Sequence, residues 1–298
     1  MSETPRRRLK ATGLTGLIFT ASMLLLVVTA CGSATDLADQ AGPQSTPSTS
    51  ATSPTPSPSA SATPAVQAPK AGECRSLDNY SLVTRVVTSA SEPIKCRTKH
   101  NAQTYAVKKM PTKVRRAAEA GESKQVLRAA RGFCSRKLGD WLKADRGTVE
   151  QSQFGFAVGV PTSSEISQGA DWVRCDLYLR NGLTNLVDLP NNTKGALKGP
   201  KSTRFHSCVK GDISNARSTV VCSKKHTWRS VSSIRLGKPA KNWPGNKKLR
   251  NEAKERCAED VRKYLNTSGS FNYGYIVPTK RVWNNGERYG VCFAKTRD

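Results

Sequence analysis

Acidic side chains are scarce in this 298-residue chain, which has 22 Asp and Glu residues against 48 Lys and Arg residues and a formal net charge of +26. Aromatic residues make up only 6% of the chain. The sequence contains no His-Glu-x-x-His, Gly-x-Ser-x-Gly or Cys-x-x-Cys motif and no glycine-rich phosphate-binding loop. These absences argue against the common hydrolase, nucleotide-binding and thiol-redox classes. We therefore expect no catalytic residues, no cofactor and no metal site.

One long apolar run, Leu14 to Ala30, follows a basic segment and ends in small residues before Cys31. This arrangement resembles a bacterial lipoprotein signal, in which the cysteine receives a diacylglyceryl group and the preceding peptide is removed. The run is short and interrupted compared with the roughly 20 apolar residues of a membrane-spanning helix, which is the alternative. We expect residues 1–30 to be a signal peptide and Cys31 to anchor the protein on the cell membrane, facing outside the cytoplasm. General secretory export and twin-arginine export both remain open.

Residues 31–69 have the composition of a linker. Small residues and proline fill most positions, and the only charged residues are Asp36 and Asp39. Such a segment has too few large apolar groups to offset its chain entropy, so we expect it to be disordered. It would hold a folded domain away from the membrane surface.

A comparison of the chain with itself reveals two sets of four cysteines after the linker. Residues 96–100 (Cys-Arg-Thr-Lys-His) match 222–226 (Cys-Ser-Lys-Lys-His), and the Val-Pro-Thr of 160–162 matches that of 277–279. We therefore predict two tandem copies, residues 70–183 and 203–298, with an inter-copy linker at 184–202. The corresponding cysteines are, in order, Cys74, Cys96, Cys134 and Cys175 in the first copy and Cys208, Cys222, Cys257 and Cys292 in the second.

Each copy is predicted to have an α+β fold, with a small, mostly antiparallel sheet and one main helix. Apolar residues at spacings of three and four predict helices from about Ser123 to Ala144 and from about Lys247 to Leu265. The apolar stripes are Leu127, Ala130, Cys134, Leu138, Trp141 and Leu142 in the first helix and Leu249, Ala253, Cys257, Val261 and Leu265 in the second. The predicted strands are Tyr80 to Thr88, Thr104 to Lys108, Trp172 to Leu179, Ser218 to Cys222, Thr227 to Ile234 and Tyr289 to Ala294.

Eight cysteines outside the cytoplasm predict disulfides. If each copy closes on itself in the same way, three pairing schemes remain. We favour the scheme that joins the first cysteine with the second, across an opening strand, and the third with the fourth, from the helix to the closing strand. Each copy would then be held by two covalent links, which compensate for its small core.

These residues resemble the septum-formation domain of actinobacterial envelope proteins. The resemblance rests on the Cys-x-x-x-His segment, the helix with a central cysteine, and a closing motif that is complete in the second copy as Trp283, Gly286, Arg288 and Cys292. The first copy keeps Gly169 and Cys175 and has Ile166 and Asp171 at the other two positions. The family carries an acid three residues after the histidine, where this chain has Gln103 and Arg229. The resemblance implies an exported or membrane-associated protein connected with division and envelope growth.

The two motif histidines, His100 and His226, are expected to have a structural, hydrogen-bonding role, with zinc ligation as the alternative. The basic side chains are the other candidate feature, because residues 70–198 carry a net charge of +10 and residues 199–298 one of +15. We expect four of them to bind anionic polymers or lipid headgroups: Lys224, Lys225, Lys247 and Lys248.

Two functions therefore compete. The first is a non-catalytic envelope module that binds anionic polymers, lipid headgroups or a division partner; the second is a wall-acting enzyme with an unrecognised active site. No nucleic-acid-binding motif accompanies the charge, so we expect no specific nucleic acid partner.

Overall fold

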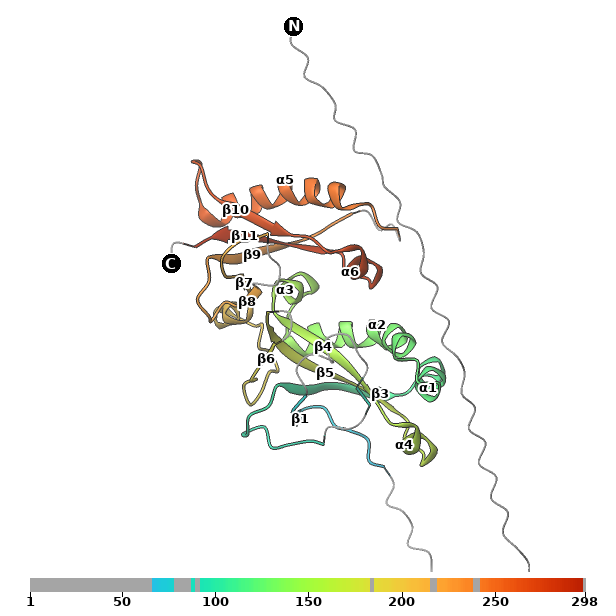
Figure 1. Ribbon diagram of the computed structural model, residues 1–298. Helices are drawn as coiled ribbons and strands as arrows, with labels where there is room; N and C mark the ends of the chain where they lie inside the picture. The colour runs from blue at the N-terminus through green and yellow to red at the C-terminus, as the bar shows by residue number, and fades with distance from the viewer. Residues whose placement is uncertain are drawn as a thin grey trace, which may run out of the picture. The chain divides into compact units, whose positions relative to one another are not determined.

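The structure is a computed structural model that describes residues 66–77, 87–88, 92–182, 185–214, 219–237 and 242–296 (Figure 1). The expected signal peptide, Cys31, nearly all of the linker and most of the expected strand Tyr80 to Thr88 lie outside these residues. The chain divides into two compact units after Ala60, so every described residue belongs to the second unit. Within this part of the chain, no helix has both the length and the apolar character needed to cross a membrane.

Two separate β-sheets organise the fold, and we call their regions the N-terminal half (residues 66–199) and the C-terminal half (residues 200–296). The strands of the first sheet follow the order β1-β3-β5-β4-β2, with β6 also pairing β5. Those of the second follow the order β10-β11-β9-β7-β8. All neighbours are antiparallel except β2 and β4. The strands are β1 (Cys74–Arg75), β2 (Val87–Thr88), β3 (Ala102–Lys109), β4 (Phe154–Val160), β5 (Trp172–Asn181), β6 (Asn185–Val187), β7 (Ser207–Val209), β8 (Thr219–Val221), β9 (Trp228–Arg235), β10 (Tyr273–Ile276) and β11 (Tyr289–Lys295).

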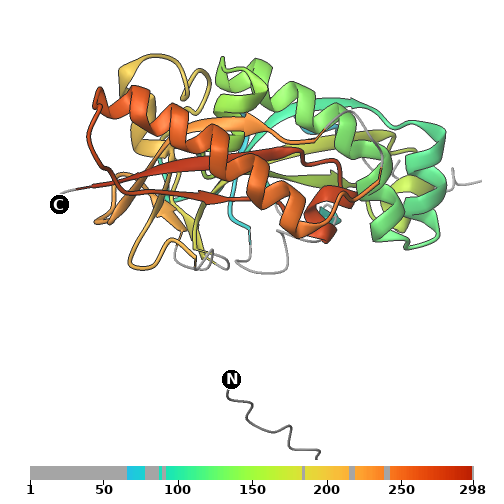
Figure 2. The ribbon, with the colours of Figure 1, turned by 90° about the horizontal axis from the view of Figure 1, so that it is seen from above.

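One 20-residue helix packs on each sheet, α2 in the N-terminal half and α5 in the C-terminal half (Figure 2). Both have buried residues at every fourth position, which places one apolar line against the sheet. In α2 this line begins at Val126, whereas the predicted Leu127 and Trp141 are only partly buried. In α5 it ends at Val261, because Leu265 lies beyond the sheet and is 38% exposed. The helices are α1 (Thr112–Glu119), α2 (Ser123–Leu142), α3 (Arg146–Gln151), α4 (Ser163–Ser167), the 3-10 helix η1 (Pro200–Phe205), α5 (Asn246–Leu265) and α6 (Lys280–Asn284).

Each half contains two disulfides, and none joins one half to the other. They join Cys74 to Cys96, Cys134 to Cys175, Cys208 to Cys222, and Cys257 to Cys292. These are the pairs expected from the sequence. The second and fourth bridges connect the middle of a long helix to the neighbouring sheet, so they lie in the centre of each core.

The face of the first sheet that points away from α2 contains a buried ionic group. The Asp176 carboxylate is fully buried and accepts hydrogen bonds from Arg174 Nε (2.8 Å) and Thr104 Oγ1 (2.6 Å). Gly159 makes room for Arg174, because a Cβ atom at Gly159 would lie 2.6 Å from Arg174 Cγ. Burial of a charge is tolerated when it is paired in this way, so we assign this group a structural role.

The segment expected to be an inter-copy linker, residues 184–202, is described from residue 185 onward and packs against the first sheet and its core. Its first residues form β6 on the edge of β5, and Leu189 and Leu197 belong to the first core. Thr193 is fully buried and donates to the Gln103 side chain from its backbone nitrogen at 3.0 Å. Buried apolar residues within a polar segment hold it in place, which composition alone did not indicate.

The two halves touch through polar and apolar contacts. Ser152 and His206 form an isolated antiparallel bridge, and Gln153 Nε2 donates to Ser207 Oγ at 2.8 Å. The ring of Phe205 lies 5.2 Å from that of Phe154 and is part of the first core. The beginning of the C-terminal half therefore contributes to the core of the N-terminal half.

Candidate functional site

Helix α5 carries its charges on two different sides. On the side of β9, Glu252 accepts a hydrogen bond from the Gly237 backbone nitrogen at 3.0 Å, and Asp260 accepts one from Ser232 Oγ at 2.7 Å. Arg256 donates to the Arg235 carbonyl on the same side at 2.6 Å. Two of the four acidic residues of α5, Glu252 and Asp260, thus help to fix the helix on the interior of the sheet.

The opposite side of α5 is basic. Lys247, Arg250 and Lys254 are spaced by three and four residues, so they share one helical face, and all three are exposed. None of them forms an ion pair with any residue that the structure describes. Because β9 contacts the other side of α5 and Arg250 lies over Tyr275 of β10, this face of the helix is turned toward the edge strand β10.

Aromatic side chains at the edge strand or just before it lie below two arginines of α5. The Arg250 guanidinium is 5.5 Å from the ring of Tyr275, and the Arg262 guanidinium is 4.8 Å from the ring of Phe271. Cation–π contacts of this kind contribute about 0.5–1 kcal/mol each at exposed sites. We call this surface the α5–β10 margin; it comprises Lys247, Arg250, Lys254, Arg262, Phe271, Tyr273 and Tyr275.

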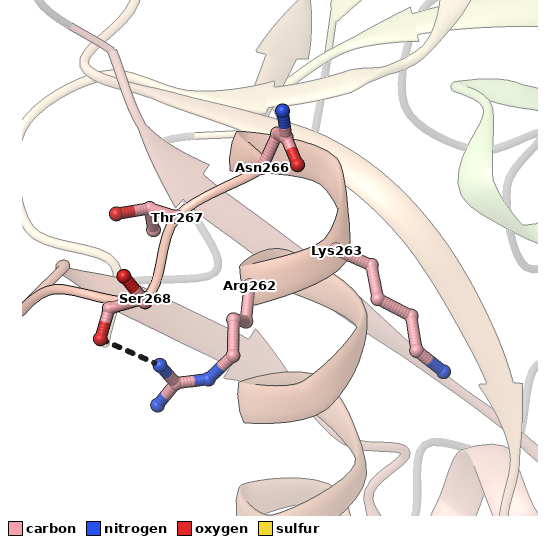
Figure 3. Close-up of a pocket in the computed structure, with 5 residues that line it drawn as sticks. All are labelled: Arg262, Lys263, Asn266, Thr267 and Ser268. Carbon is pink, nitrogen blue, oxygen red and sulfur yellow. Dashed lines mark hydrogen bonds between the residues drawn. The ribbon is translucent and has the colours of Figure 1, made fainter.

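A depression of about 430 Å³ lies at the C-terminal end of α5 (Figure 3). Arg262 bends back to donate a hydrogen bond to the Ser268 carbonyl at 3.4 Å, while Lys263 extends to the other side of the helix. Lys263 is also paired with Glu259 at 2.6 Å. Asn266, which adopts the left-handed conformation with φ of 47°, closes the helix. The polar groups do not converge on one point, so this depression has the character of a helix terminus.

The four lysines predicted to bind polyanions are all exposed, but the structure does not bring them together. Lys224 and Lys225 lie just before the first residue of β9. Lys247 and Lys248 lie in the first turn of α5, which follows the last residue of β9 in the chain. Helix α5 runs antiparallel to β9, since Glu252 contacts Gly237 and Asp260 contacts Ser232. The two lysine pairs therefore lie near opposite ends of a strand of eight residues, about 25 Å long.

Both motif histidines are buried, and each bonds to the backbone carbonyl two residues before it. His100 Nδ1 donates to the Thr98 carbonyl at 2.8 Å, and His226 Nδ1 donates to the Lys224 carbonyl at 2.7 Å. Each thereby stabilises the turn that contains it. Among the described residues, no group of three or more His, Cys, Asp or Glu side chains is arranged to hold a metal ion.

The residues of the closing motif are explained by the backbone conformation and packing of the turn before the closing strand. Gly169 and Gly286 follow α4 and α6 with φ of 92° and 94°, a region that favours glycine, and each ends its helix. Trp283 is fully buried, and the Arg288 guanidinium lies 4.0 Å from its ring. These residues therefore shape the turn into the closing strand.

Sequence reasoning missed a charged cluster between the two halves. Glu287, in the turn before β11, pairs with Arg131 of α2 and with Arg146 of α3 at 2.7 Å. Glu150 also pairs with Arg146, at 2.5 Å. Burial, together with the neighbouring Glu287, raises the pKa of Glu150 to about 8. Burial opposes ionisation of Glu287 as well, but the hydrogen bond from Glu150 and the two guanidinium groups outweigh it and lower its pKa.

In the sequence, the one feature that could have indicated this cluster is the rarity of acidic residues in the C-terminal half. Glu287 is one of only seven acidic residues in 199–298, and it stands between two motif positions, Gly286 and Arg288. An acid in so basic a region needs a specific partner. Only the fold reveals that the partner is in the other half.

The comparisons with known proteins give one match. A family model described as Septum formation matches residues 71–292. No curated protein and no solved structure matches the chain.

Proposed function

Because this chain belongs to the Septum formation family, we propose that it is a non-catalytic, lipid-anchored envelope module that binds anionic envelope polymers or lipid headgroups. The role is related to septum formation through the family. Cys31 would hold the protein on the outer side of the cell membrane, and residues 31–69 would act as a flexible tether. The basic surface of the C-terminal half would provide the contact.

We further propose that the two halves are tandem copies of one domain. The shared strand order supports this, since β1-β3-β5-β4 corresponds to β7-β9-β11-β10. The four disulfides support it as well, because they occur at corresponding places in both halves. The two histidines repeat the same hydrogen bond, and the two glycines repeat the same positive φ. Equivalent local geometry in two places is the expected result of duplication.

The observation that carries the binding proposal is the row of exposed, unpaired cations at the α5–β10 margin. Two of these cations, Arg250 and Arg262, lie over aromatic rings, and none of the four forms an ion pair with a carboxylate of the described chain. An ordinary solvated helix face alternates both signs of charge, as the β9 side of α5 does through the Arg256–Glu252 pair. A face of one sign attracts anions over a distance set by the salt concentration.

The test is co-sedimentation of the protein with vesicles that contain anionic phospholipid, over a range of salt concentration. Binding should fall steeply as salt rises, because exposed charges are screened within about 8–10 Å at physiological ionic strength. Reversal of two margin cations, Lys247→Glu and Lys254→Glu, should weaken binding by about tenfold or more. The control reverses two exposed cations of α1, Lys113→Glu and Arg116→Glu, which changes the net charge equally. An equal loss in the control would show that only total charge matters.

The second candidate function is an enzyme that acts on the wall. Its support is the Glu150–Glu287 pair, because two carboxyl groups with separated pKa values can serve as acid and base. The two arginines that hold the pair favour a structural role instead. Release of labelled fragments from purified wall, lost in the Glu150→Gln variant, would establish the enzyme.

A further inference from the structure

The outer edge of β4 in the N-terminal half is covered by another strand. Val87 and Thr88 of β2 pair in parallel with Gly159 and Val160 of β4. The strand comes from the segment between the first two cysteines, whose separation in sequence is 22 residues. In the C-terminal half the corresponding separation is only 14 residues. The segment is therefore eight residues shorter, and none of its described residues pairs with β10.

The equivalent edge in the C-terminal half is accordingly open within the described chain. Strand β10 pairs only with β11 there, and it ends its sheet. Edge strands are normally protected by charges, proline or a bulge. The four residues of β10, Tyr273 to Ile276, include neither a charged residue nor proline, and their pairing with β11 has no bulge. This edge can accept a further strand.

In the N-terminal half, the arginine that lies over the corresponding strand β4 binds a carboxylate. Arg131 of α2 lies 5.7 Å from the ring of Phe156 in β4 and pairs with the Glu287 carboxylate, which comes from the C-terminal half. When the two helices are aligned on their central cysteines, Lys254 takes the place of Arg131, and when the strands are aligned on the Val-Pro-Thr that follows them, Tyr273 takes the place of Phe156. Lys254 is exposed and has no carboxylate partner among the described residues. This step rests on the tandem duplication proposed above.

From these relationships we propose that the α5–β10 margin binds an extended acidic peptide segment of a protein partner, which adds as a strand to β10. The peptide backbone pairs with the outer edge of β10, and its acidic side chains meet Lys247, Arg250 and Lys254. Backbone pairing supplies affinity, and the cations select acidic sequences. The site is formed before binding, because α5 is fixed on the sheet through β9.

A second molecule of this chain is a poor occupant. The position that corresponds to Glu287 in the N-terminal half is Ala170, so that half cannot offer an equivalent carboxylate. Its neighbour Asp171 is already paired with Arg115 at 2.6 Å. The chemistry therefore points to a different protein with an acidic, extended segment.

The test uses a short synthetic peptide of alternating glutamate and valine, the full-length protein, and hydrogen exchange read by mass spectrometry. The amides of β10 should gain protection when the peptide binds, while those of β9 in the sheet interior should change little. A second peptide of the same sequence, N-methylated at alternate residues, keeps the charges but cannot pair as a strand. It should bind about tenfold more weakly, the effect of about two lost backbone hydrogen bonds.

Variants separate this site from general charge. The Arg250→Glu/Lys254→Glu variant should lose peptide binding, whereas Lys113→Glu/Arg116→Glu on α1 should retain it. Equal binding of the two peptides without protection of β10 would overturn strand addition and leave the charge-based function intact. The same conclusion follows if neither peptide binds while anionic vesicles still do. If neither the peptides nor the vesicles bind, both proposals fail.

Discussion

Arg146 Nη2 and Glu287 Oε2 lie 2.7 Å apart, although 141 residues separate them in the sequence. Arg131 adds a second guanidinium to the same carboxylate. Glu287 thus connects the turn before β11 with both α2 and α3, and its side chain is only 17% exposed. This cluster is the main ionic contact between the two halves that the structure describes.

Replacement of Glu287 by glutamine should destabilise the protein. The variant loses the charge that compensates two partly buried guanidinium groups, and we expect the free energy of unfolding to fall by about 1–2 kcal/mol, between the values for surface and buried pairs. Urea unfolding measures it. The control is Glu259→Gln, whose pair with Lys263 is exposed and screened by solvent, so its loss should change the free energy of unfolding much less. Equal losses in the two variants would contradict a bridging role of Glu287.

Stability should depend on pH through Glu150. Its folded pKa of about 8 is above the ordinary value, so between about pH 4.5 and 8 the folded protein holds a proton that the unfolded chain has released. The contribution of Glu150 is therefore fully present below about pH 4.5 and is lost as the pH rises to about 8. Glu287 acts in the opposite sense, because its lowered pKa contributes stability that is lost as the pH falls below the ordinary range.

The variant Glu150→Gln isolates this effect. Glutamine keeps a neutral donor toward Glu287 but cannot titrate, so the decline in unfolding free energy between pH 5 and 8 should become smaller by up to about 4 kcal/mol, at about 1.4 kcal/mol for each pH unit. Urea unfolding at several pH values measures the slope. An unchanged slope would mean that Glu150 does not hold its proton in the folded state.

The loss of unfolding free energy on removal of a single disulfide should increase with the length of the loop that the disulfide closes. The Cys134–Cys175 bridge closes 41 residues and the Cys208–Cys222 bridge closes 14. The loop-entropy relation gives losses of about 4 and about 3 kcal/mol for the paired alanine variants. Complete burial of Cys134 and Cys175 adds lost packing to the first value. A larger loss for the shorter loop would show that native-state effects dominate over chain entropy.

Replacement of Cys31 by alanine tests the anchor. We expect the uncut precursor to accumulate, with no incorporation of labelled fatty acid, because the thiol that receives the lipid is gone. Two or three acyl chains hold a protein stably on a membrane at about 0.8 kcal/mol per buried methylene. Continued acyl labelling of the variant would place the lipid elsewhere.

The sequence by itself determined the mixed helix and sheet fold and the long helices, and it favoured the disulfide scheme that the structure shows. Apolar residues at every third or fourth position place a stripe on a helix whatever surrounds it, and the predicted helices Ser123 to Ala144 and Lys247 to Leu265 lie within two residues of α2 and α5. Two sets of four cysteines restricted the pairing to a few schemes. These features depend on local periodicity and on comparison of the chain with itself.

Only the tertiary structure decided which charges meet. It separated Lys224 from Lys247, placed the cations of α5 over β10 and joined Glu287 to Arg146. It also packed residues 185–199 onto the first sheet and its core, where the bounds of the two copies had indicated a linker. Whether a charge is paired or free depends on the distance and burial of groups far apart in the sequence, because electrostatic energy varies with separation in space and with the surrounding dielectric.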